Sequence, residues 1–182
     1  MSDTVKTPSR INIGLLSESI DVDDPFAAFL ALRSVYGDDE VALLESLGGP
    51  GIDNTSALIQ FGLVVEIRIA ARRIDIAGVS GVRARLLQRL LHAQLIQVES
   101  DGHRMADTAS VWDVARACQL SFDAPDSSAM SFDVGFSAVL AYEIAAETEN
   151  LTFANPATDD TPDIVLRLYS STIEYDLATR AA

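Results

Sequence analysis

Apolar and polar residues alternate along the middle of the chain. The apolar positions of segment 65–76 are Val65, Ile67, Ile69, Ile74 and Ile76. Charged residues stand between most of them. Because successive side chains of a strand point to opposite faces of a sheet, this period of two predicts strands with one wet face. A tight turn near Ala71 and Arg72 makes the pair an antiparallel hairpin.

A helix is predicted over residues 25–37. Asp24 is suited to cap its first turn, and Pro25 suits the first helical position. Gly37 is the residue type that commonly follows a helix C-terminus. We expect the apolar side chains of this helix to lie roughly on one face, and they are Phe26, Phe29, Leu30 and Val35.

Two further helices are predicted from capping residues and helical spacing. The second helix would be capped by Ser80, with Val82, Leu86 and Leu90 on its inner stripe. The third would begin with a capping box formed by Ser110 and Asp113. Its apolar positions are Val111, Val114, Ala115 and Cys118, with Trp112 beside that stripe as a core or interface residue.

The remaining apolar segments read as strands. They are residues 10–16, 41–46, 92–100, a buried strand running into a helical turn within 132–145, and one or two strands within 163–176. Strands and helices do not alternate regularly, so the fold class is α+β, with a largely antiparallel sheet and about three packed helices. We expect a flexible N-terminus over 1–9, one domain over 10–182, and a polar loop at 150–162.

Charge and composition narrow the classes of partner. The 182 residues carry a formal net charge of -14, which argues against nucleic acid and against an anionic membrane surface. No apolar run approaches the length that spans a bilayer, and the first residues lack a secretory signal. We therefore expect a soluble, cytoplasmic protein. The single cysteine, Cys118, is expected to be a small buried hydrophobe.

Catalytic and cofactor motifs are not evident in the sequence. The glycines near residue 49 lack the Lys-Ser/Thr ending of a phosphate-binding loop. His92 is expected at a helix end and His103 in an exposed turn, and neither sits in a metal-ligand pattern. No serine has the context of a nucleophile elbow. We therefore expect no catalytic residue, metal or cofactor in this chain, and no activity from it alone.

Four segments in series resemble the N-terminal domain of anthranilate synthase component I-like, chorismate-utilising enzymes. They are "DPFAAFLALRS" with "ALLES", "SALIQFGLVVEIRIAARRIDIAGVSG", "AVLAYEIAAETENL" and "DTPDIVLRLYSSTIEYDLATR". Together they cover nearly the whole chain in the order of the family. The family ending has a histidine where this chain has Leu177, while Asp176 and Arg180 fit it.

The resemblance implies a domain without the active site. In the family, the chorismate pocket, its Mg²⁺-binding glutamates and its catalytic histidine belong to a C-terminal domain. This chain ends at Ala182, about where that domain would start. We therefore expect an excised domain, a split subunit or a relic, working with a chorismate-binding catalytic domain or subunit and with a glutamine amidotransferase subunit. The product, whether anthranilate, aminodeoxychorismate or a secondary metabolite, stays open.

The resemblance also assigns a candidate ligand site. In feedback-regulated members the Leu-Leu-Glu-Ser strand end forms part of the tryptophan inhibitor site, which maps onto Leu44, Glu45 and Ser46. Two departures count against a working site. No base stands at residues 54–56, and Ala138 and Val139 replace glycines of the family.

Two alternatives to the ligand site stay open. Glu45 and Ser46 would otherwise satisfy backbone groups of their own loop. The whole chain would otherwise be a stand-alone interaction module that keeps the fold without catalysis or amino-acid binding. An exposed apolar face would favour that module.

Overall fold

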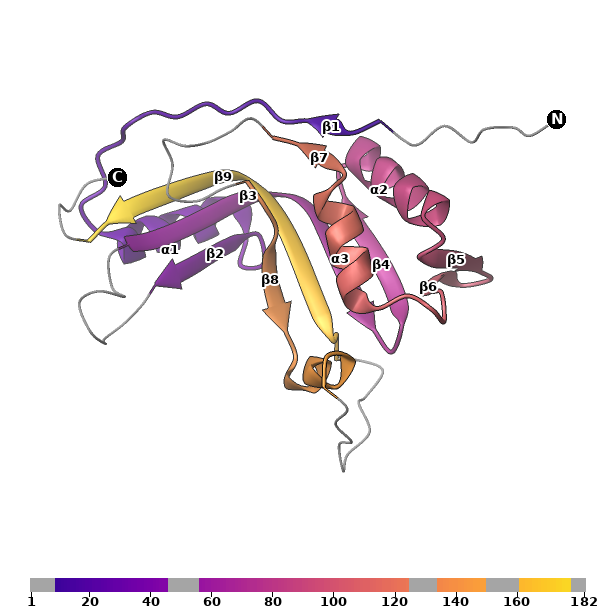
Figure 1. Cartoon of the computed structure of the whole chain (residues 1–182). Coiled ribbons are helices and arrows are strands. Elements are labelled where there is room, and N and C mark those ends of the chain that lie inside the picture. The colour runs from indigo at the N-terminus through magenta and orange to yellow at the C-terminus, as the bar shows by residue number, and fades with distance from the viewer. Residues whose placement is uncertain (1–8, 46–55, 125–133, 150–160, 178–182) are drawn as a thin grey trace. The chain divides into compact units, whose positions relative to one another are not determined.

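The computed structural model describes residues 9–45, 56–124, 134–149 and 161–177 (Figure 1). Its helices are α1 (Pro25–Tyr36), α2 (Ser80–His92), α3 (Val111–Gln119) and the 3₁₀ helix η1 (Tyr142–Glu147). Its strands are β1 (Ile11–Asn12), β2 (Val41–Glu45), β3 (Ser56–Ala70), β4 (Arg73–Gly78), β5 (Ile96–Glu99), β6 (Gly102–Met105), β7 (Phe122–Asp123), β8 (Ser137–Leu140) and β9 (Ile164–Asp176). Residues 1–8, most of the predicted flexible N-terminus, and 150–160, most of the predicted polar loop, lie outside the described residues.

One mostly antiparallel sheet of seven strands organises the fold. Its hydrogen-bonded order is β5-β6-β4-β3-β9-β8, and β2 pairs with β3 as well. A second sheet holds only β1 and β7, which run parallel. Three α-helices accompany these sheets in the described residues, so the predicted α+β class is confirmed.

The chain forms two compact units. Unit 1 comprises Met1–Leu15 and Val65–Leu168, and unit 2 comprises Leu16–Val64 and Tyr169–Ala182. Strands β3 and β9 contribute residues to both units.

The predicted hairpin forms the centre of unit 1. Strands β3 and β4 pair with Ile67 opposite Ile76 and Ile69 opposite Ile74. The turn residues Ala71 and Arg72 have φ angles of 45° and 67°, which matches the twist that two-residue hairpin turns require. The Asp163 carboxylate accepts a hydrogen bond from the Ala71 amide at 3.1 Å, so the turn is held from the start of β9.

Helices α2 and α3 bury most of the stripes that their spacing predicts, while Val82 and Ala115 are half-buried. Leu86 and Leu90 of α2 are fully buried. The capping box of α3 is confirmed, because the Ser110 hydroxyl accepts from the Asp113 amide and the Asp113 carboxylate accepts from the Ser110 amide. The buried residues of α3 are Val111, Val114 and Cys118.

Several local predictions for unit 1 are wrong. Ser80 does not cap α2, because the cap position is Val79 and no side-chain hydrogen bond forms there. The strand predicted over 10–16 shrinks to β1, a two-residue pairing with β7. His103 lies within strand β6 and is half-buried, since β6 returns along β5 in a hairpin. The strand expected to be buried, β8, is mostly exposed, and among the described strands it pairs with β9 alone.

Helix α1 of unit 2 begins and ends as predicted. The Asp24 carboxylate accepts from the amides of Phe26 and Ala27 at 2.9 and 3.3 Å, and Pro25 opens the helix. The Gly37 amide closes it by donating to the carbonyl of Arg33. Local chemistry alone therefore determines the limits of this helix.

The expected single apolar face of α1 is wrong. Its residues are apolar or small almost all round, and no residue of α1 is buried. Ala28, Phe29, Leu32 and Arg33 are partly covered, whereas Phe26, Leu30 and Val35 are exposed. At about 100° per residue, Phe26, Phe29 and Val35 point in different directions. The apolar set therefore exceeds what one side of the helix can bury.

Candidate functional site

The end of strand β2 carries the predicted ligand residues. Strand β2 pairs antiparallel with the first part of β3, placing Leu44 opposite Leu58 and Glu45 opposite Ala57. Both described residues are therefore fixed by backbone pairing within unit 2. Ser46 lies outside the described residues.

Leu44 and Glu45 point to opposite faces of the sheet, because successive strand residues alternate. Residues directly opposite each other in an antiparallel pair share a face. Val41 lies opposite Phe61, whose ring centroid is 5.3 Å from that of Tyr36 in α1. Glu45 is four residues after Val41 on the same strand, so the two side chains share a face. The side chain of Glu45 therefore lies on the face that α1 covers. The side chain of Leu44 lies on the other face, 47% exposed.

This alternation divides the candidate site. A ligand that packs on the Leu44 side chain faces away from the Glu45 carboxylate, so the two side chains do not close on one group. The Glu45 carboxylate has no hydrogen-bond or ion-pair partner among the described residues. The structure thus brings Leu44 and Glu45 together as neighbours along the backbone and separates their side chains.

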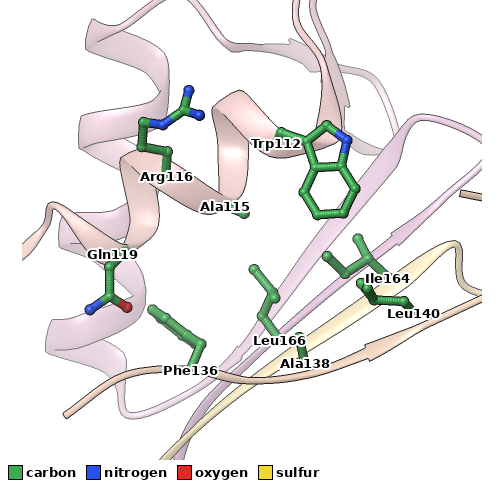
Figure 2. Close-up of a pocket in the computed structure, with 9 residues that line it drawn as sticks. All are labelled: Trp112, Ala115, Arg116, Gln119, Phe136, Ala138, Leu140, Ile164 and Leu166. Atoms are coloured by element: carbon green, nitrogen blue, oxygen red, sulfur yellow. The ribbon is translucent and has the colours of Figure 1, made fainter. Parts of the chain in front are cut away.

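A hollow of about 310 Å³ lies within unit 1, apart from the end of β2. Figure 2 shows that residues of α3 face residues of β8 and β9 across it. Its lining is Trp112, Ala115, Arg116, Gln119, Phe136, Ala138, Leu140, Ile164 and Leu166. Trp112, Ala115 and Ala138 were each named from the sequence, but they were not placed together. The others come from three separate segments, and no local motif marks their convergence.

The lining of this hollow contains no reacting group. The six-membered ring of Trp112 points toward Leu140 and Ile164 (Figure 2). Its indole N–H is buried without a hydrogen-bond partner among the described residues. Arg116 is engaged with Asp113 at 3.6 Å, and the Gln119 amide donates to the carbonyl of Val134 at 3.3 Å. The hollow offers apolar packing and no nucleophile, acid or base.

The surroundings of Cys118 and Glu66 in unit 1 indicate a structural role and not a catalytic one. Burial raises the pKa of the Cys118 thiol to about 12, so the thiolate that reacts is not formed near neutral pH. The Arg167 Nε lies 2.7 Å from the carboxylate of Glu66, and Arg68 approaches the same carboxylate at 3.6 Å. This cluster is a cross-strand ion pair on the sheet rather than an acid–base pair.

The described residues contain neither a metal-binding cluster nor a helix that could span a membrane. No group of three or more His, Cys, Asp or Glu side chains there is arranged to hold a metal ion. His92 ends α2 and His103 lies on β6, so the two histidines belong to different elements. Within the same ranges, no helix combines the length and apolarity needed to cross a membrane.

Comparison with known proteins confirms the predicted resemblance. The chain is related to the N-terminal part of a chorismate-utilising, anthranilate synthase-like enzyme. That relative is the 2-amino-4-deoxychorismate synthase of Streptomyces globisporus, and it is 30% identical over 177 residues. The match covers 96% of this chain and 34% of the relative, so the chain spans about a third of that protein's length. No protein-family model matches the chain.

Proposed function

We propose that this chain is the non-catalytic N-terminal part, or a split subunit, of an anthranilate synthase-like enzyme. It would work with a separate chorismate-binding catalytic part that converts chorismate into an aminated product. The proposal rests on the match to a third of a 2-amino-4-deoxychorismate synthase, over nearly the whole of this chain. Mg²⁺ and the catalytic residues would belong to the catalytic part, and a glutamine amidotransferase subunit would supply ammonia.

Reconstitution tests this role. Purified chain is mixed with the remaining two-thirds of the Streptomyces globisporus synthase, expressed as a separate polypeptide, and chorismate consumption is followed with ammonia and Mg²⁺. We expect no turnover by the chain alone and faster turnover by the mixture than by the catalytic part alone. Equal rates with and without the chain, together with no complex on a sizing column, would refute the role.

A regulatory function is the finer part of the proposal. Tryptophan, or a similar amino acid, would bind at the end of β2 with its apolar ring on the exposed Leu44 side chain. The opposed directions of Leu44 and Glu45 favour backbone groups of Glu45 as ligand contacts over its carboxylate. Hydrogen bonds from an amino acid's ammonium group to backbone carbonyls suit such a strand end.

Calorimetric titration tests this site with matched ligands. We expect tryptophan to bind the wild-type chain, and Leu44→Asp to weaken binding at least tenfold. Glu45→Gln should change affinity less than threefold if backbone groups hold the ammonium. Indole-3-propionate, which lacks the ammonium group, should bind more weakly than tryptophan to the wild type and to Glu45→Gln. Absence of heat at millimolar tryptophan, with and without the catalytic part, would remove the regulatory function.

A stand-alone interaction module is the second candidate, and the exposed residues of α1 favour it. Phe26, Leu30 and Val35 leave an apolar surface that a binding module would use. The reconstitution experiment separates the two candidates, because a module with another partner would not accelerate chorismate turnover.

A further inference from the structure

We propose that the outer face of α1 is the surface on which the catalytic part docks. This face consists of the exposed residues Phe26, Ala27, Leu30, Ala31, Ser34 and Val35. The inference rests on the proposed function, because it names the place where the two parts of the enzyme meet.

The outer face carries no charge. The single charged residue of α1 is Arg33, which is not among the residues of this face, and its guanidinium makes two contacts. It lies 2.8 Å from the Asp38 carboxylate and 5.4 Å from the ring centroid of Phe29. In a chain with a net charge of -14, a helix face without an acid is unusual for a surface that only meets water.

The one polar group on the outer face is already satisfied. The Ser34 hydroxyl donates to the carbonyl of Ala31 at 2.7 Å within the helix. Covering the face would therefore leave no orphan side-chain donor, and the cost of removing water from it is small. Phe26 is 53%, Leu30 47% and Val35 76% exposed, so burial of these side chains would drive docking.

The shape of the face fits a protein partner. Ala27, Ala31 and Ser34 form a low central strip, and larger side chains flank it: Phe26 and Leu30 on one side and Val35 on the other. Small residues allow close approach of a neighbouring backbone, while the flanking apolar side chains enter its grooves. A helix that is apolar nearly all round is typical of one covered on two sides. In unit 2, α1 packs against β2, and the residues of the outer face stay exposed.

A membrane is a poor occupant for this face. Helices that lie in a membrane surface carry Lys and Arg along their polar face, and α1 has only the paired Arg33. The catalytic part is the occupant favoured here. In the relative, the segment that matches this chain makes up 34% of the protein, and the rest, about twice as long, belongs to the same polypeptide.

Two substitutions of opposite charge test the docking surface. Leu30→Asp and Ala31→Arg both place a charge on the outer face, and both positions are exposed, so the variants should fold. Gln88→Asp on the exposed side of α2 is the matched control. Binding to the separately expressed remaining two-thirds of the Streptomyces globisporus synthase is measured by titration calorimetry, and self-association by sedimentation velocity.

We expect both outer-face variants to weaken binding at least tenfold and the α2 control to change it less than twofold. Loss with one charge and gain with the other would indicate long-range electrostatics and overturn the docking surface. Unchanged binding by both variants would place the contact elsewhere and overturn it, while leaving the proposed function intact. A dimer of the chain that either variant dissociates would assign the face to a second copy. No binding by the wild-type chain would refute the proposed function and this surface together.

Discussion

Helix α3 in unit 1 and helix α1 in unit 2 solve the same packing problem differently. Helix α3 buries Val111, Val114 and Cys118 and turns the charged Arg116 to solvent. Helix α1 is longer and more apolar, yet buries no residue. Both helices are well capped, by Ser110 and by Asp24 respectively.

The difference shows that good capping and apolar content do not by themselves bury a helix. Helix α3 divides its residues into two faces, so its apolar stripe is buried within unit 1, where α3 packs against α2. Helix α1 has apolar residues on more than one face, and the described part of unit 2 covers one of them. An apolar stripe that the chain itself buries is part of the core, whereas an apolar face that stays exposed is a candidate interface.

The largest expected effect on stability is a contrast between a helix with buried side chains, α2, and the exposed helix α1. Leu90→Ala in α2 removes a fully buried side chain, so we expect a loss of about 2–5 kcal/mol in the free energy of unfolding. Leu30→Ala in α1 truncates an exposed one and should cost below about 1 kcal/mol. Urea unfolding of both variants measures the contrast, and equal losses would mean that α1 is buried within the chain.

Gly62 provides a test within β3 itself. It has a φ of 69° in the middle of a long strand, and an added Cβ would collide with the Ser170 hydroxyl oxygen. Gly62→Ala should therefore lower the free energy of unfolding by about 1–3 kcal/mol. The double variant with Ser170→Ala removes the colliding atom and should recover part of that loss. No recovery would attribute the whole cost to the backbone angle.

The loss of stability on removing a capping residue should be smaller, and it should occur only at a helix whose cap forms side-chain hydrogen bonds. Ser110→Ala removes both hydrogen bonds of its hydroxyl in the α3 capping box and should cost about 1 kcal/mol. Ser80→Ala is the matched control, since Ser80 makes no capping bond at α2. Thermal unfolding compares the two, and a loss with Ser80→Ala as large as with Ser110→Ala would contradict the assigned caps.

The smallest expected effect is a pH dependence in unit 1. Burial raises the pKa of Asp163 above its ordinary value of 3.8, opposed by the hydrogen bond from Ala71 and aided by Glu143. The folded state therefore binds this proton more tightly than the unfolded state, and stability falls as pH rises from 3.8 through the raised pKa. Asp163→Asn keeps an acceptor for the Ala71 amide and removes this titration.

The stability of Asp163→Asn relative to the wild type should thus increase with pH across that window and level off above it. Urea unfolding at a series of pH values measures the difference. Glu143→Gln removes a charge that helps to raise the pKa of Asp163, so it should narrow the pH range over which the wild-type stability falls. A difference between Asp163→Asn and wild type that stays constant with pH would show that Asp163 titrates alike in both states.

Local sequence determined the elements that local chemistry controls. The period of two over 65–76, the caps at Asp24 and Ser110 and the stop at Gly37 each predicted a feature that the structure has. These features depend on residues close together in the chain, where backbone geometry and capping hydrogen bonds dominate. Ser80 failed as a cap because Val79 took the cap position, and the position of a helix start is less fixed than its existence.

Tertiary structure decided burial, direction and convergence. The sequence of β2 and α1 reads as buried, and only the packing of unit 2 shows Leu44 and Leu30 exposed. The stretch Leu44–Ser46 suggested one ligand site, and pairing with β3 set the side chains of Leu44 and Glu45 on opposite faces. The hollow beside Trp112 needs segments that are far apart in the chain. Such features depend on which surfaces meet, and that information is spread over the whole chain and its partners rather than over any one stretch.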